Sequence, residues 1–276
     1  MDVSLIAVPY DSAHRGERMG AGPLALLDAG LERRLTSRGH DVRVSLVEPP
    51  AGSWRAEIRT AFELAGLVAS AVREARAEGR LPLVLSGNCG VSLGVVAALS
   101  GDARVVWCDA HGDFNTPETT TGGFLDGMGL ATLVGRCWSA LARGVAGFAP
   151  IPEERVWLVG ARDLDPAEAE LLRASAVQQV PAASVGAALA ARIADEAEGA
   201  PLYLHLDLDV MDPSDGRANG YAAPGGVRAR KLAEFAGSLA RAPLAAMTLS
   251  AYDPAADADG RAREVAMAAI EAVLAH

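Results

Sequence analysis

Short runs of apolar residues recur along the chain and alternate with longer segments in which apolar and polar residues are mixed. Most of the short runs are continuously apolar rather than alternating, which is typical of strands buried on both faces of a sheet. The predicted strands are Val3–Val8, Val42–Val47, Leu81–Leu85, Arg104–Cys108, Arg155–Val159, Leu202–Leu208 and Leu244–Leu249, with Val177–Val180 as a weaker candidate.

The longer segments are rich in Ala, Leu, Glu and Arg at helical spacing. The predicted helices are Pro23–Arg38, Arg55–Glu78, Val91–Leu99, Pro166–Ala174, Gly186–Ala197, Arg228–Arg241 and Gly260–Ala275. Alternation of strands and helices predicts an α/β fold, with a mainly parallel sheet covered by helices on both faces. The sequence contains no internal repeat and no linker-like segment, so we expect residues 1–276 to form one domain.

Polar residues that can bind metal follow two of the predicted strands. Asp109, His111 and Asp113 come at positions i, i+2 and i+4 after one strand, and Asp207 and Asp209 end another. Side chains at this spacing share one face of an extended chain, and carboxylates with an imidazole suit Mn²⁺, Zn²⁺ or Fe²⁺. Ligands of open parallel sheets bind outside the carboxyl ends of the strands, where these residues are expected.

The charge of such a cluster favours two ions. Two carboxylates about 4 Å apart repel each other by roughly 1–4 kcal/mol, and no Lys or Arg lies close by in the sequence to compensate four of them. Asp is also common in turns that follow strands. Two separate clusters, each at a strand end and one with a His, favour the metal site over that alternative.

The composition indicates which kinds of binding partner and which cellular compartment are expected. A formal net charge of −10 argues against nucleic acid as a partner. The three cysteines, Cys89, Cys108 and Cys137, are too few and odd in number for a disulfide framework, which indicates a reducing compartment and predicts a cytoplasmic location. The N-terminal run resembles a strand rather than a signal peptide, and no apolar stretch is long enough for a membrane span.

These motifs together resemble the arginase-like ureohydrolases, a family of arginases, agmatinases and formiminoglutamases. The resemblance covers nearly the whole chain and implies a three-layer α/β/α domain with two metal ions, manganese in the first place, that forms a homo-oligomer. The matching segments are Arg15–Pro23, Asp109–Pro117, Thr119–Thr121, Gly160–Pro166 and Asp207–Pro213.

The resemblance also implies a role for individual residues. Asp109 and Asp207 would bridge the two metals, His111 and Asp209 would complete the shell of one metal, and Asp113 that of the other. A hydroxide bridging the metals would attack the guanidino carbon of a small substrate. Substrate contacts would come from Asn115 and Thr120 to a carboxylate and from Asp165 to an amino group.

The first of three departures from the family pattern is at a metal ligand. Cys89 stands where the family has a ligating His. A thiolate binds divalent metals but is softer than imidazole, so it would favour Zn²⁺ or Fe²⁺ over Mn²⁺. The alternative is that Cys89 is only a small buried residue and that its metal is weakly held or absent. The sequence leaves both open.

The other two departures concern the catalytic groups. Asp126 stands where arginases place a proton-shuttling His, and a carboxyl group can also relay protons. Asp126 is equally an ordinary residue at a helix start. The catalytic candidates are Asp113 and Asp126. Ala251 stands where arginases have the Glu that receives the guanidinium, and Asp253 replaces it only if the local register differs. His205 is interpreted as a hydrogen-bonded core residue.

The sequence therefore predicts a metal-dependent hydrolase of a C–N bond in a linear amidine. Arginine, N-hydroxyarginine and related guanidino or amidino compounds are the expected substrates. Hydroxyarginine is favoured because a less basic guanidine depends less on the missing Glu. The alternative is a non-catalytic or metal-depleted family member that acts as a binding protein. A dinucleotide-binding oxidoreductase is disfavoured because no Gly-X-Gly-X-X-Gly follows the first strand.

Overall fold

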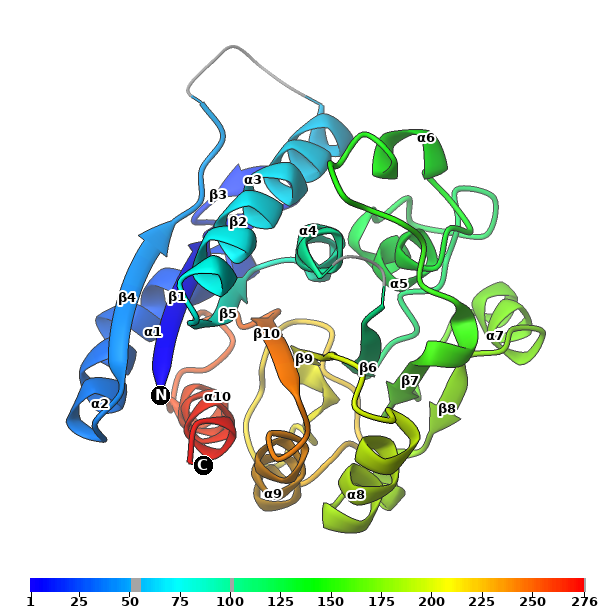
Figure 1. Ribbon diagram of the computed structural model, residues 1–276. Coiled ribbons are helices and arrows are strands. Elements are labelled where there is room, and N and C mark those ends of the chain that lie inside the picture. Colours follow the sequence, from blue (N-terminus) through cyan, green and yellow to red (C-terminus); the bar gives the residue numbers. More distant parts are fainter. Residues whose placement is uncertain (51–55, 100–101, 276) are drawn as a thin grey trace.

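The computed structural model describes residues 1–50, 56–99 and 102–275. Eight strands form a parallel sheet in the order β4-β1-β5-β10-β9-β6-β7-β8 (Figure 1). They are β1 (Asp2–Val8), β4 (Asp41–Leu46), β5 (Leu81–Ser86), β6 (Arg104–Cys108), β7 (Val156–Val159), β8 (Gln178–Val180), β9 (Leu202–Asp207) and β10 (Leu244–Ser250). Each predicted strand, including the weaker one, is present within one residue of its expected bounds.

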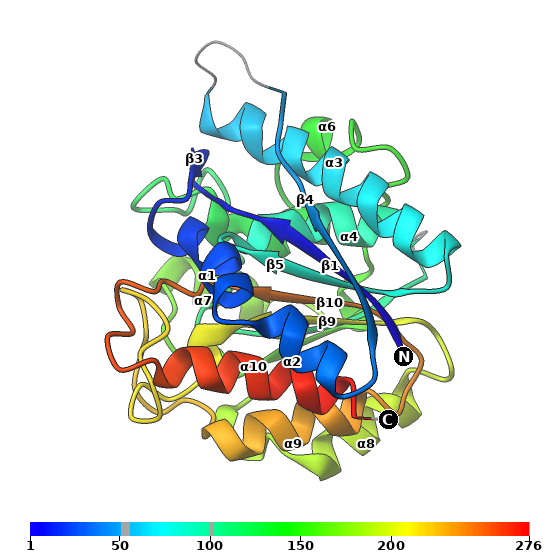
Figure 2. The same ribbon diagram turned by 90° about the vertical axis from the view of Figure 1, so that its left-hand side faces the viewer.

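Helices cover both faces of this sheet, so the predicted three-layer α/β/α arrangement is confirmed (Figures 1 and 2). One face carries α1 (Gly22–Asp28), α2 (Leu31–Ser37), α8 (Ala187–Glu196), α9 (Ala229–Leu239) and α10 (Arg261–Val273). The other carries α3 (Glu57–Ala77), α4 (Ser92–Ala98), α5 (Gly129–Leu133), α6 (Ser139–Ala142) and α7 (Pro166–Arg173). Within the described ranges, no helix is long and apolar enough to cross a membrane.

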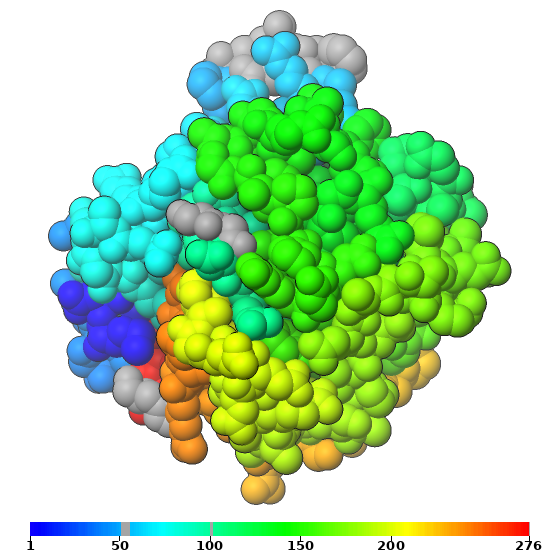
Figure 3. All heavy atoms as spheres, turned by 45° about the vertical axis from the view of Figure 1, so that its right-hand side comes forward, coloured from blue at the N-terminus to red at the C-terminus, as the bar shows by residue number. Residues whose placement is uncertain are grey.

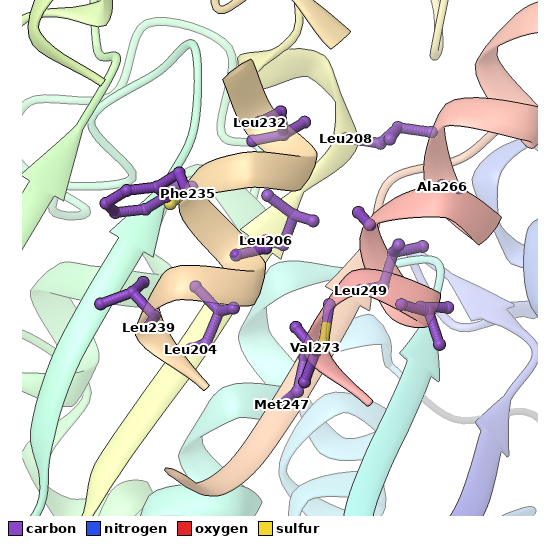
Figure 4. Close-up of a cluster of buried hydrophobic side chains, with 14 of the residues drawn as sticks. Leu204, Leu206, Leu208, Leu232, Phe235, Leu239, Met247, Leu249, Ala266 and Val273 are labelled. Carbon is purple, nitrogen blue, oxygen red and sulfur yellow. The ribbon is translucent and has the colours of Figure 1, made fainter. Parts of the chain in front are cut away.

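Alternating side chains of the central strand β9 enter two different cores. Leu204 and Leu206 point toward α9 and α10, where they meet side chains such as Phe235 in the first core (Figure 4). Tyr203 belongs to the second core, on the side of α3 and α4. All four are at most 1% exposed. A strand with both faces buried in this way explains why its sequence is continuously apolar.

The structure departs from the predicted helices in a few places. The expected helix Pro23–Arg38 is two helices, because Gly30 adopts a φ of 91° between α1 and α2. The start of the expected helix at Arg55 lies outside the described residues, and α3 begins at Glu57. The short helices α5 and α6 and the hairpin of β2 (Tyr10–Asp11) and β3 (His14–Arg15) were not predicted.

The segment that carries α5 and α6 covers α4 from outside. Figure 3 shows its green surface beside the cyan surface of α3. Arg73 of α3 donates a hydrogen bond of 3.1 Å to the carbonyl of Ala146, which follows α6. The helix α4, whose amino end lies at the carboxyl edge of the sheet, is therefore enclosed between α3, the sheet and this segment.

Two glycines on the helices α3 and α4 have opposite surroundings. A Cβ atom on Gly94 of α4 would lie 2.2 Å from the carbonyl oxygen of Ala65, whereas a Cβ on Gly66 of α3 would meet nothing within 4 Å. The close approach of the two helices thus requires the absence of a side chain at Gly94, whereas there is room for one at Gly66.

We expect Gly94→Ala to lower the free energy of unfolding by about 1–3 kcal/mol, because it forces α4 away from α3. The matched change Gly66→Ala should raise it by roughly 0.5–1 kcal/mol, because Ala has the higher helix propensity. Urea unfolding followed by circular dichroism measures both. Equal effects of the two changes would contradict this account of the helix contact.

Candidate metal centre

The strand register brings the two predicted aspartate clusters together. Cys108 of β6 pairs with Leu206 of β9, so Asp109 and Asp207 follow side by side at the carboxyl edge of the sheet. Beyond them the chain turns, at Asp113 through a φ of 48° and at Asp209 through a 3₁₀ helix, Leu208–Val210. A left-handed conformation of a non-glycine residue stores strain that is typical of functional sites.

Backbone amides hold these carboxylates in place. Asp109 accepts a hydrogen bond from the amide of His111 at 2.7 Å, and Asp207 accepts one from the amide of Asp209 at 2.8 Å. The indole of Trp107 also donates to Asp109, at 3.1 Å. By contrast, Oδ2 of Asp113 is buried and has no hydrogen-bond partner. A buried carboxylate oxygen without a partner is costly, and a cation would satisfy it.

Ligand atoms converge in two groups that share one residue. In the first, atoms of Cys89, Asp109 and His205 all lie within 4.8 Å of one another, and in the second the same holds for Asp109, His111 and Asp209. A carboxylate common to two groups is the arrangement that a bridging ligand of two ions requires. The chemistry of these donors fits divalent transition metals.

Cys89 reaches this centre from a strand that is not adjacent to β9. It lies in a 3₁₀ helix after β5, and β10 runs between β5 and β9. Its thiol donates to Oδ2 of Asp207 at 3.0 Å, and its sulfur lies 3.2 Å from the hydroxyl of Ser250 at the end of β10. The sulfur of Cys89 thus lies over the end of β10, beside Asp207, and its role as a ligand stays a prediction.

The centre opens into a cavity of about 370 Å³. Asp109 lies behind its wall, and the other predicted site residues all line it. These are Cys89, His111, Asp113, Asn115, Thr120, Asp126, Asp165, Asp207 and Asp209. Phe124 and Tyr221 stack at its mouth with ring centroids 5.8 Å apart.

The carboxylates of the centre are buried and lie close to one another, and both conditions disfavour their charged forms. Burial first, and neighbouring carboxylates second, raise the pKa values of Asp113 and Asp207. Burial lowers the pKa of His111, but its hydrogen bond with Asp109 and the charge of Asp209 raise it overall, to about 9. The protonated His111 is thus the cation that these carboxylates attract, and a divalent ion would displace its proton.

The nearest arginine does not neutralise the centre. Arg162 has its guanidinium hydrogen-bonded to main-chain carbonyls of the loops around it, namely those of Gly160, Asp209, Val210, Met211, Ala223 and Pro224. It therefore fixes the turn that carries Asp209 without pairing with a carboxylate. In the described part of the chain, no Lys or Arg forms an ion pair with the metal-centre aspartates.

The residues expected to hold the far end of a substrate also lie together. The amide of Asn115 donates to Asp165 at 3.1 Å, and the amide of Gly123 donates to the hydroxyl of Thr120 at 3.0 Å. Asp165 is the N-cap of α7, in a capping box with Glu168. This cap fixes the position of Asp165 relative to the cavity. The sequence alone did not indicate this role.

Asp126 uses its carboxylate to hold the turn at Cys89. It accepts hydrogen bonds from the amides of Gly90 at 2.8 Å and Cys89 at 3.0 Å, and from the side chain of Asn88 at 2.9 Å. Burial raises the pKa of Asp126 to about 6 although these bonds lower it. Of the two roles left open by the sequence, this geometry supports a structural one, which positions Cys89.

The position of the expected guanidinium-binding Glu offers no carboxylate. Ala251 lines the cavity with a φ of 62°. Asp253 does not line it and instead accepts a hydrogen bond from the amide of Ala255 in a turn. Asn219, which no sequence motif indicated, lies between Asp209 and Ala251. Its side-chain amide donates to Asp209 at 3.1 Å and to the carbonyl of Ala251 at 2.9 Å. Its only signal in the sequence is its place in a Gly-rich loop.

Comparison with known proteins agrees with this geometry. The profile described as "Arginase family" matches residues 1–275. The chain belongs to the arginase family. Among its relatives, the N(omega)-hydroxy-L-arginine amidinohydrolase of Streptomyces lavendulae is 33% identical over 86% of this chain and 84% of its own length. The arginase of Bacillus caldovelox is 31% identical over 83% of each chain.

Solved structures of the arginase family share the fold. The crystal structure of arginase from Bacillus cereus superposes with a TM-score of 0.89 at 27% identity and covers 99% of this chain and 97% of its own. The family resemblance inferred from the motifs is thereby confirmed, and so is the arginase-like fold.

We expect Asp126→Ala to lower the free energy of unfolding by about 1–3 kcal/mol, because it leaves buried amide donors without an acceptor. Asp259→Ala serves as the control. Asp259 is an exposed aspartate paired with Arg261, and its loss should leave the free energy of unfolding nearly unchanged, because water and salt screen an exposed ion pair. Urea unfolding near pH 7.5 measures both. Parent-like stability of Asp126→Ala would contradict the structural role.

Proposed function

We propose that this protein is a binuclear metal-dependent amidinohydrolase that acts on N-hydroxyarginine or a closely related guanidino compound in preference to arginine. The family places the chain among hydrolases of C–N bonds in linear amidines. The observation that supports the finer statement is Ala251, which leaves the wall of the cavity without a carboxylate where a guanidinium would be received.

Two metal positions account for the converging donors. Cys89, Asp109, Asp113 and Asp207 would hold one ion, and Asp109 and Asp207 would share the second with His111 and Asp209. Two divalent ions bound there would lower the pKa of a water molecule and polarise the substrate carbon. Manganese is the first expectation, and Zn²⁺ or Fe²⁺ follows from the thiol of Cys89.

The opposite wall of the cavity suits an amino acid. The hydroxyl of Thr120 accepts a hydrogen bond from Gly123, so its own hydrogen is available to a substrate carboxylate. Asn115 adds a polar contact beside it, and Asp165 presents a carboxylate to an α-amino group. These residues would orient the guanidino end toward the metal centre.

A hydroxyguanidine fits the altered wall better than a guanidinium does. Arginine carries a full positive charge, and without a carboxylate partner that charge loses a charge-assisted hydrogen bond of about 1.5–3 kcal/mol. The less basic hydroxyguanidine is bound as a neutral group, so it loses less binding free energy when the carboxylate is absent. The relative from Streptomyces lavendulae bears the name of such an activity.

A cytoplasmic, homo-oligomeric protein in which the whole chain forms one domain remains a prediction from the sequence. None of these three features enters the argument for the reaction.

The substrate preference is tested by urea or hydroxyurea release from each compound. We expect kcat/KM for N-hydroxyarginine to exceed that for arginine by at least about 10-fold, as a lost charge-assisted bond implies. Ala251→Glu should raise the ratio of arginine to hydroxyarginine turnover by about 10-fold, because it restores a carboxylate in an unchanged backbone conformation. Asp253→Asn, outside the cavity, is the matched control and should leave the ratio unchanged. Equal turnover of both substrates by the parent enzyme would refute the preference.

The binuclear centre is tested by elemental analysis after loading with Mn²⁺ or Zn²⁺. We expect two ions per chain, because the donors form two groups around Asp109. Cys89→His should retain two ions and shift the preference toward Mn²⁺, whereas Cys108→Ala, a change at a buried cysteine outside the centre, should alter neither. Less than one ion per chain under both loadings would favour a binding protein without catalysis.

A further inference from the structure

His205 lies directly beneath the metal centre, on the strand that ends in Asp207. It is completely buried. Its ring stacks on Trp107 with centroids 3.7 Å apart and an angle of 21°. Because Trp107 also donates to Asp109, the same indole fixes both the ring and the carboxylate.

The two ring nitrogens of His205 have different surroundings. Nδ1 lies 2.9 Å from the hydroxyl of Ser92 and 3.4 Å from that of Tyr203. Nε2 lies on the other side, 3.4 Å from the hydroxyl of Ser250, which itself contacts the sulfur of Cys89. In the tautomer whose Nδ1 carries the proton and donates it to Ser92, the lone pair of Nε2 lies on the side of Ser250 and Cys89. Metal-bound histidines show this arrangement, with the second nitrogen bound to an outer partner.

The distances agree with a shared ion. Ligand atoms of Cys89, Asp109 and His205 lie within 4.8 Å of one another. Metal–sulfur, metal–nitrogen and metal–oxygen bonds of about 2.0–2.3 Å place two ligands of a tetrahedral ion about 3.5 Å apart. Small shifts of the side chains would bring all three atoms onto one ion. The partnerless oxygen of the nearby Asp113 is a further buried donor at this centre.

An ordinary core histidine explains less of this environment. The sequence interpretation of His205 as a hydrogen-bonded core residue accounts for the contacts of Nδ1. It does not account for Nε2, whose contact with Ser250 is long at 3.4 Å, or for the convergence of a thiol, a carboxylate and this imidazole within 4.8 Å of one another.

We propose that His205 is a metal ligand through Nε2 and replaces the imidazole that is missing at Cys89. At the first metal position, the imidazole of His205 would then join the thiolate of Cys89 and the carboxylates already proposed there, those of Asp109, Asp113 and Asp207. Binding releases the thiol proton to solvent. This mixed donor set suits a zinc-like cation better than it suits Mn²⁺, whereas the second position, around His111, keeps a harder set. The inference rests on the proposed binuclear centre.

Direct detection of the bond is the decisive experiment. The full-length protein, labelled with ¹⁵N in its five histidines, is loaded with ¹¹³Cd²⁺ as a spectroscopic stand-in for zinc. Scalar coupling between ¹¹³Cd and a ring nitrogen appears only through a bond. We expect coupling at two rings, Nε2 of His205 and Nδ1 of His111, the latter being the nitrogen that faces Asp109 and Asp209. The variants His205→Gln and His111→Gln assign the two signals.

The outcomes separate this inference from the proposed function. Coupling at both rings supports it. Coupling at His111 alone overturns the role of His205 and leaves the metal centre standing. Coupling at neither ring overturns both. The parent protein shows how many rings couple and through which nitrogen, Nε2 or Nδ1, and His111→Gln assigns the signal of His111, so the outcomes can be read even if His205→Gln does not fold.

Cobalt spectroscopy provides a second readout. We expect Co²⁺ at the first position to show a sulfur-to-metal charge-transfer band that is lost in Cys89→Ser. The visible ligand-field bands should shift in His205→Gln and stay unchanged in His40→Gln, a change at a histidine near the N-terminus. Unshifted bands in a folded His205→Gln would count against the proposal. Affinity alone does not discriminate, because loss of an outer partner also costs about 10–100-fold.

Discussion

Uncompensated negative charge at the carboxyl ends of β6 and β9 is the constraint on which the rest of the site depends. Asp109, Asp113, Asp207 and Asp209 are each at most 6% exposed and stand within one small region. Main-chain amides bind an oxygen of Asp109, Asp207 and Asp209 and fix its direction, but amides carry too little charge to cancel four carboxylates. The folded chain therefore favours cations at this point, which is where the proposed reaction would take place.

The departures from the family pattern lie on one side of this centre. The β6 and β9 side retains the aspartates and His111. The changes occur beyond β5 and β10, where Cys89 and Ala251 follow the two strands and the amide of Ala251 donates to the carbonyl of Ser86. Asp126 belongs to the same side, since it binds the turn of Cys89. The proposed metal-binding half of the site thus keeps the residue types that the family resemblance implies, while the half proposed to meet the guanidino group departs from them.

This division explains why a change of substrate is a more economical interpretation than loss of activity. Loss of catalysis would relieve the pressure to keep buried aspartates together, because each costs stability when it lacks a cation. Here the partnerless oxygen of Asp113 and its left-handed backbone both remain. At the far end of the cavity, the Asn115–Asp165 hydrogen bond and the cap of α7 are in place where we propose that an amino-acid substrate binds.

The sequence by itself determined the strands, the aspartate clusters and their common edge, because strand burial and side-chain alternation are local properties that appear directly in the order of residues. It also identified Cys89, Asp126 and Ala251 as departures without deciding their roles. Only the tertiary structure showed where these side chains lie and what they contact. Strand order places β10 between β5 and β9, and Cys89 reaches Asp207 across the end of β10, in contact with Ser250. Likewise, the packing of α4 over the sheet brings Ser92 to His205. Such contacts join segments more than a hundred residues apart, and their geometry depends on how whole layers pack, which no local pattern records.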